Sequence, residues 1–111
     1  MTDPVEQQLD AYNRRDIDAF LDAFARGVHV EDALGNRLMT GKSQMRPPYE
    51  KMFRNSPDLQ CVVATRIDVA DWVFTDECVS GLVMEGAPIE TRGVAAYHVK
   101  NGKIHLLRLY F

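Results

Sequence analysis

The sequence has no basic region. Its 13 lysines and arginines are outnumbered by 16 aspartates and glutamates and are scattered along the chain, which carries a formal net charge of −3. Nucleic acids and anionic membrane surfaces bind clustered positive charge. We therefore expect no nucleic-acid partner and no membrane partner.

The sequence also has no long apolar run. No segment approaches the ~18 consecutive apolar residues of a membrane-spanning helix. The first ten residues, MTDPVEQQLD, are acidic where a secretory signal is basic and then apolar. Together these absences favour a cytoplasmic protein.

Cysteine and histidine are scarce. Cys61 and Cys78 both fall in predicted strands, and in a reducing compartment we expect free core thiols rather than a disulfide. The three histidines lack metal-ligand spacing, and only His105 falls on a face inferred to point inward. A glycine-rich phosphate loop and a nucleophile elbow are also missing from the sequence. We expect no metal and no cofactor.

The chain does have enough apolar residues for one core, since 46% of its 111 residues are hydrophobic. We expect a single domain over residues 1–111. Asp3, followed by a proline and then an acid, predicts the start of a first helix that ends at residues 13–15. Asp16 caps a second helix, which Gly27 ends. Its apolar residues recur at helical spacing: Ile17, Phe20, Leu21 and Phe24.

A third helix is predicted after Gly41 from the stripe Met45, Tyr49, Met52 and Phe53. Pro47 and Pro48 interrupt this pattern, because a proline beyond the first turn lacks the N–H that a helix needs. We expect the helix to begin near Arg46 or to kink there, and so to set the rim of a pocket.

The rest of the chain alternates with a period of two, which indicates strands. The first two strands are predicted at 28–32 and 37–39 around Gly35-Asn36. Later strands are predicted at 59–73, 78–85, 89–100 and 103–111, separated by Thr75-Asp76, residues 86–88 and Asn101-Gly102. Helices followed by an antiparallel meander predict an α+β fold.

The last predicted strand has two apolar faces. His105, Leu107, Leu109 and Phe111 alternate with Ile104, Leu106, Arg108 and Tyr110. The three helices can cover only one side of a sheet, and an apolar face needs a cover. We expect a homodimer through the outer face of the last two strands.

The segment VHVEDALG ends a predicted strand in Asp32. If Val28 and Val30 face the core, period-two alternation sends Asp32 inward. There desolvation would raise its pKa and make it a useful general base. The alternative is that Asp32 accepts backbone N–H groups of the following turn.

Three segments carry a family resemblance: YNRRDIDAF at 12–20, VEDALG at 30–35 and NGKI at 101–104. With two amphipathic helices and a long sheet, the chain resembles the nuclear-transport-factor-2-like superfamily. It is most similar to the SnoaL-like and ketosteroid isomerase-like branch. The resemblance implies a cone-shaped barrel, with three N-terminal helices packed on a strongly curved, mainly antiparallel sheet.

The resemblance also implies roles for single residues. In the isomerases of this family the aspartate of Val-Glu-Asp is the general base, and it falls on Asp32. The two oxyanion-hole donor positions, a tyrosine and a protonated aspartic acid, fall on Gln8 and Ala95. Because both donors are changed, true steroid isomerisation is not expected. Gln8 or Tyr49 is the candidate replacement donor.

These inferences leave two hypotheses. The first is an enzyme that transfers a proton on a hydrophobic carbonyl compound, with isomerase or polyketide cyclase-like chemistry and Asp32 as base. The second is a non-catalytic module that binds an apolar metabolite or mediates dimerisation. Both imply a small apolar pocket. The residues expected to line it are Gln8, Tyr12, Phe24, Tyr49, Ser80, Leu82, Met84, Ala95, Tyr97, His105 and Phe111.

Overall fold

A computed structural model describes residues 3–111 as three helices packed on one six-stranded sheet. Helices occupy the first half of the chain and strands the second, with one early hairpin between α2 and α3. In chain order the elements are α1 Pro4–Arg14, α2 Ile17–Asp22, β1 Phe24–Asp32, β2 Arg37–Thr40, α3 Lys42–Asn55, β3 Gln60–Val69, β4 Trp72–Ser80, β5 Thr91–Lys100 and β6 Lys103–Tyr110.

The first two helices begin where the sequence predicts. The Asp3 side chain accepts the Val5 N–H, and the Asp16 side chain accepts the Ala19 N–H, so each aspartate satisfies a free donor of a helix start. The predicted end of the second helix at Gly27 is wrong. α2 stops at Asp22, and Phe24 already pairs with Ile104 of β6, because strand pairing overrides the helical pattern there.

The third helix differs from its prediction. It starts at Lys42 and runs through both prolines to Asn55, rather than beginning near Arg46. Pro47 and Pro48 remove the bonds to the carbonyls of Ser43 and Gln44, but these two residues are exposed, so water can satisfy them. Burial of Met45 and Phe53 against the core holds the helix in place.

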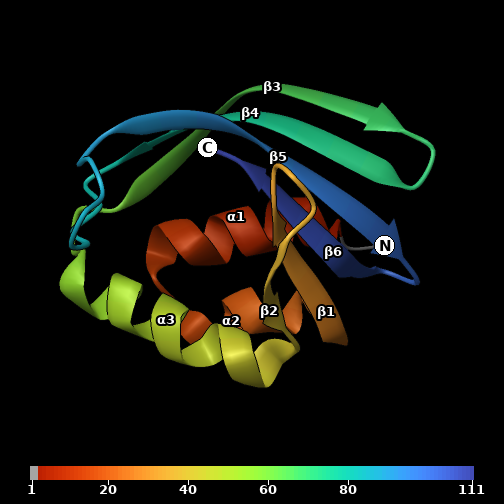
Figure 1. Cartoon of the computed structure of the whole chain (residues 1–111), viewed down its shortest axis with the longest axis horizontal. Coiled ribbons are helices and arrows are strands. Elements are labelled where there is room, and N and C mark those ends of the chain that lie inside the picture. The colour runs from red at the N-terminus through yellow and green to blue at the C-terminus, as the bar shows by residue number, and fades with distance from the viewer. Residues whose placement is uncertain (1–2) are drawn as a thin grey trace.

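The strands form a mixed sheet in the order β2-β1-β6-β5-β4-β3. β1 is parallel to β6 and every other neighbouring pair is antiparallel. The sheet curves strongly over the helices, which all lie on its concave side (Figure 1). The α+β prediction is therefore confirmed, and the curved sheet does not close on itself.

Two hairpin turns test the predicted strand limits. Asn101-Gly102 is a two-residue turn between Lys100 and Lys103, with both residues at positive φ. Thr75-Asp76 is not a turn and lies inside β4. The chain instead reverses at Ala70-Asp71, with Ala70 at φ 53°.

Other features of the described residues bear on the predictions. None of the helices within residues 3–111 is both long and apolar enough to cross a membrane. Cys61 is a buried free thiol, whereas Cys78 is free but exposed, so the expectation of two core thiols is wrong for Cys78. Cys78 pairs with Val62 on the outer face of the sheet.

Candidate functional site

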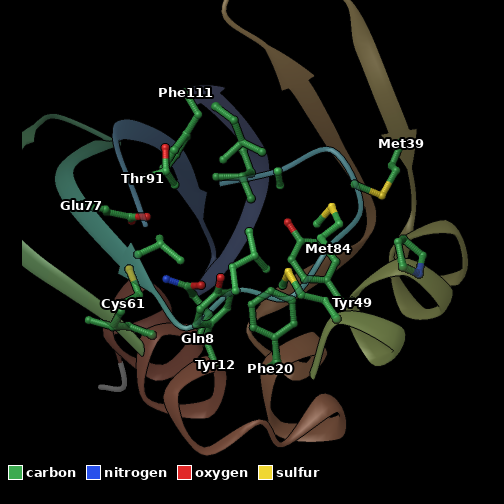
Figure 2. Close-up of a pocket in the computed structure, with 18 of the residues that line it drawn as sticks. Gln8, Tyr12, Phe20, Met39, Tyr49, Cys61, Glu77, Met84, Thr91 and Phe111 are labelled. Carbon is green, nitrogen blue, oxygen red and sulfur yellow. The ribbon is translucent and has the colours of Figure 1, made fainter. Parts of the chain in front are cut away.

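A cavity of about 500 Å³ lies between the helices and the concave face of the sheet (Figure 2). α1 and α3 supply one wall, the sheet supplies the opposite wall, and the loop at 81–90 and Phe111 complete it. Most of the lining is apolar, which is typical of a small-molecule site. Its apolar residues from helices and strands include Leu9, Phe20, Met39, Met52, Val79, Leu107 and Leu109.

Glu77 is the one charged side chain that lines this cavity within residues 3–111. It is only 7% exposed, and Figure 2 shows its carboxylate directed from β4 toward the cavity. The Thr75 hydroxyl donates to Glu77 Oε2 at 2.6 Å and the Tyr97 hydroxyl donates to the same oxygen at 3.0 Å. No N–H or O–H group within residues 3–111 donates to Oε1. The neighbouring Cys61 thiol contacts the carboxylate, and burial followed by this contact raises the pKa of the thiol.

Gln8 extends this network from α1. Its side-chain Nε2 donates to the Tyr97 hydroxyl at 3.1 Å and to the Val5 carbonyl at 3.0 Å. Both amide N–H groups of Gln8 are therefore used within the protein. The Tyr97 O–H is committed to Glu77, and burial followed by the Glu77 charge raises the pKa of Tyr97 well above its ordinary value. Gln8 and Tyr97 are positioned to hold Glu77 rather than to bind a ligand oxygen.

Tyr12 and Tyr49 are the free phenols of the cavity. Within residues 3–111 neither hydroxyl has a hydrogen-bond partner in the protein, and Figure 2 shows both rings at the helical wall. Burial, and then the charge of Glu77, raises the pKa of Tyr49 to about 12. Burial also raises the pKa of Tyr12, with further increases from Tyr49, Cys61 and Glu77. Both phenols thus keep their protons at neutral pH.

Cys61 lies beside this group on β3. It is 5% exposed and lines the cavity. Burial raises the pKa of its thiol and the Glu77 carboxylate raises it further, so Cys61 is a neutral thiol rather than a nucleophile. The Asn13 side chain forms two hydrogen bonds with the backbone of Cys61. It accepts the Cys61 N–H at 2.7 Å and donates to the Cys61 carbonyl at 3.0 Å.

Asp32 does not behave as the sequence predicts. Its Oδ1 accepts the N–H groups of Leu34 and Asn36, each at 2.9 Å, and its Oδ2 accepts the Asn36 side-chain amide at 3.1 Å. These bonds, the two from Asn36 first, lower its pKa. The expected carboxylate with a raised pKa is wrong, because Asp32 ends its strand and the adjoining turn offers three donors. It does not line the cavity.

The other predicted pocket residues divide into two groups. Those that line the cavity are Gln8, Tyr12, Tyr49, Leu82, Met84, Tyr97 and Phe111. Four do not line it. Phe24 and Ala95 are fully buried in the core, Ser80 lies on the outer face, and the ring of His105 contacts the Lys100 carbonyl at 3.2 Å.

Two local features explain the misplaced residues. The buried face of β4 carries Val73, Thr75, Glu77 and Val79, so Cys78 and Ser80 point the other way. Because Thr75-Asp76 was predicted to be a turn, the inward and outward faces of this strand were exchanged in the prediction, and Glu77 was not identified as an inward-facing residue. His105 falls where the pairing register between β5 and β6 shifts, which removes it from the inner face.

Within residues 3–111, no three histidine, cysteine or acidic side chains lie together in a group that could hold a metal ion. The site has polar side chains that can act on a bound molecule. These are a buried carboxylate with one free oxygen and two protonated phenols, all facing one apolar cavity. Such a set can remove a proton from a bound molecule and donate a hydrogen bond to it.

Comparison with known proteins places this geometry in a family. Residues 5–106 match the model described as a SnoaL-like domain. No curated protein matches the chain.

Solved structures share its fold. An uncharacterised cystatin-fold protein from Novosphingobium aromaticivorans is 20% identical, with a TM-score of 0.87 over 100% of this chain and 99% of that chain. A provisionally assigned polyketide cyclase from Sinorhizobium meliloti is 21% identical, with a TM-score of 0.79 over 98% and 94%. A protein with a ketosteroid isomerase-like fold from Catenulispora acidiphila is 17% identical, with a TM-score of 0.77 over 100% and 86%.

At these identities the solved structures establish the architecture, and the match over residues 5–106 establishes the family. The chain belongs to the SnoaL-like domain family of the nuclear-transport-factor-2-like superfamily.

Proposed function

We propose that the protein binds a hydrophobic carbonyl compound in its cavity and moves a proton to or from the carbon next to the carbonyl. Glu77 is the general base, and Tyr49, assisted by Tyr12, is the hydrogen-bond donor to the carbonyl oxygen. The observation that carries this proposal is the free Oε1 of Glu77, which shares an apolar cavity with two unpartnered phenols.

The environment of Glu77 suits a base. Two hydroxyl donors hold Oε2 in place, while the carboxylate faces the apolar cavity. No lysine, arginine or histidine lines the cavity within the described chain, so no ion pair blocks the carboxylate. Glu77 thus replaces Asp32, whose oxygens are all engaged by the turn at 32–36.

The phenols suit the opposite role. When a proton leaves the carbon, negative charge develops on the carbonyl oxygen, and a donor placed there stabilises the transition state. Tyr49 keeps its proton because burial raises its pKa to about 12. This pairing agrees with the kind of chemistry named for the Sinorhizobium neighbour, a provisionally assigned polyketide cyclase.

A second candidate function is binding without chemistry. The donor positions implied by the isomerase resemblance hold Gln8, whose N–H groups are both used, and Ala95, which has no donor. A cavity of about 500 Å³ with mostly apolar walls can bind a metabolite without converting it.

The test is exchange of hydrogen at carbon. Cyclic ketones of one to three fused rings are incubated with the protein in D2O, and NMR follows deuterium entering the position next to the carbonyl. Glu77→Gln preserves size and removes the base, so exchange should fall by about 10²-fold or more. Tyr49→Phe should weaken it by about 10-fold or more. Glu90→Gln, an exposed acid on the loop at 81–90, is the matched control.

The outcomes separate the two functions. Unchanged exchange in Glu77→Gln would refute the assigned base. Ketones that raise the melting temperature of the wild-type protein without any exchange would favour binding alone.

A further inference from the structure

A second cavity, of about 220 Å³, lies behind Glu77. We call it the rear cavity, and the cavity described above the front cavity. Gln8, Leu9 and Glu77 line both, so these three side chains form the partition between them. Thr75 and Val63 line only the rear cavity. Glu77 is therefore accessible from two sides.

The rear cavity is polar at both ends. At its inner end are the Glu77 carboxylate and the Thr75 hydroxyl that donates to it at 2.6 Å. At its outer end it reaches the surface at Glu6 and Arg66, both exposed, between α1 and β3.

The charge at the outer end is already balanced. Arg66 forms ion pairs with Asp3 and Asp68, so its guanidinium is not a free anion site. A space of this volume with several donors and acceptors suits water, which needs two to four polar partners.

The front cavity gives Glu77 no route to exchange a proton while a ligand fills it. The hydrogen-bond chain through Tyr97 and Gln8 ends at the Val5 carbonyl, which has no proton to pass on. The apolar walls and the ligand itself would keep water away from the carboxylate on that side. The rear cavity joins the polar groups at Glu77 to the surface at Glu6 and Arg66.

We propose that the rear cavity holds water and is the route by which Glu77 exchanges protons with solvent during turnover; this inference rests on the proposed function. The C–H proton moves to a Glu77 oxygen, and the C–H electron pair passes into the enolate of the ligand. Glu77, now a neutral acid, exchanges its proton with water in the rear cavity. It then delivers the solvent proton to a carbon of the enolate, so the product is neutral and the carboxylate regains its charge. The Thr75 hydroxyl orients the carboxylate at this boundary.

The experiment follows the fate of a labelled proton. A cyclic β,γ-unsaturated ketone, deuterated between the carbonyl and the double bond, is converted to its conjugated isomer in H2O. Label that Glu77 returns directly is retained at the γ carbon, and label that exchanges through the rear cavity is lost to solvent. In the wild type we expect most of the label to be lost.

Val63→Trp fills the rear cavity, and Thr75→Val removes the hydroxyl with little change of shape. Each should shift the product from mostly unlabelled to mostly labelled. Conversion continues in Val63→Trp and slows in Thr75→Val, which loses one of the two hydroxyl donors to Glu77. Ala64→Trp is the matched control, because Ala64 is exposed on the same strand and lines neither cavity. Thr75→Val keeps the test valid if Val63→Trp does not fold.

Each outcome has one reading. Conversion with the wild-type loss of label in both variants overturns the rear route and leaves Glu77 as base. Absence of conversion in the wild type overturns both the rear route and the proposed function.

Discussion

At the scale of single residues, the placement of N–H donors separates the two carboxylates that matter most. Asp32 lies at the start of a tight turn and accepts three N–H groups, so its charge is satisfied locally. Glu77 lies in the middle of a strand whose own N–H groups are paired, and it receives only two hydroxyls. Asp32 therefore stabilises a turn, and Glu77 retains an oxygen for other partners.

Replacing Asp32 should lower stability without affecting the cavity. Because the folded-state pKa of Asp32 is lowered, its contribution is present above the unfolded pKa of ~3.9 and is lost as pH falls through the folded value. Thermal denaturation should thus show Asp32→Ala below wild type at pH 7, with the difference shrinking toward pH 3. Asp32→Asn should fall between them, since its Oδ1 still accepts N–H groups. Equal stability of Asp32→Ala and wild type at pH 7 would contradict this role.

At the scale of elements, features that depend on neighbouring residues could be predicted from the sequence, and features that depend on residues distant in the chain could not. Asp3 and Asp16 cap helices through hydrogen bonds to residues two or three positions away, so the local sequence pattern was sufficient to predict where these helices start. The end of α2 and the length of β4 depend on pairing with strands distant in the chain. The β3–β4 turn was missed because Ala70-Asp71 contains none of the glycine or asparagine that usually marks such a turn.

Ala70 offers a direct measurement of that turn. Its φ of 53° is left-handed, a conformation that is unfavourable for alanine and free of steric penalty for glycine. Ala70→Gly should raise the free energy of unfolding by about 0.5–1 kcal/mol, as measured by urea denaturation. Ala64→Gly, in an exposed position inside β3, is the control and should lower it by about 0.5–1 kcal/mol. A loss of stability in Ala70→Gly would argue against the left-handed turn.

At the scale of the whole molecule, the site is built from strands for which the sequence predicts only some of the inward-facing residues correctly. Thr91 and Tyr97 of β5 line the cavity, as uninterrupted alternation along that strand predicts. Glu77 was missed, because one turn placed five residues too late changes the face of every later residue in β4. The partition between the front and rear cavities joins α1 to β4, a contact that no local pattern encodes.

Within residues 3–111, no helix covers the opposite face of the sheet (Figure 1). This face bears apolar side chains. They include five exposed residues, which we call the outer patch: Val62, Ile67, Val69, Val94 and Tyr110. Trp72 contributes an aromatic group beside them, with its ring 4.8 Å from His98. Four strands of eight to ten residues span about 30 by 19 Å at ~3.3 Å per residue and ~4.8 Å between strands. Two such faces present about 1,140 Å² in total, which is close to the ~1,200 Å² at which stable interfaces begin.

We therefore expect a homodimer formed through the outer patches of two chains. Two ion pairs flank the patch, Arg92 with Asp76 and Arg108 with Glu31. Their charges cancel, so a second copy can approach without net charge repulsion. Sedimentation at micromolar concentration should give twice the 12.6 kDa chain mass. Val94→Lys places a charge on β5 within the patch and should give monomers, because an unpaired charge in an apolar interface is strongly unfavourable. Val83→Lys, at an exposed valine on the loop at 81–90 outside the patch, should remain dimeric. A wild-type protein that sediments as a monomer, or a Val94→Lys variant that stays dimeric, would exclude this interface.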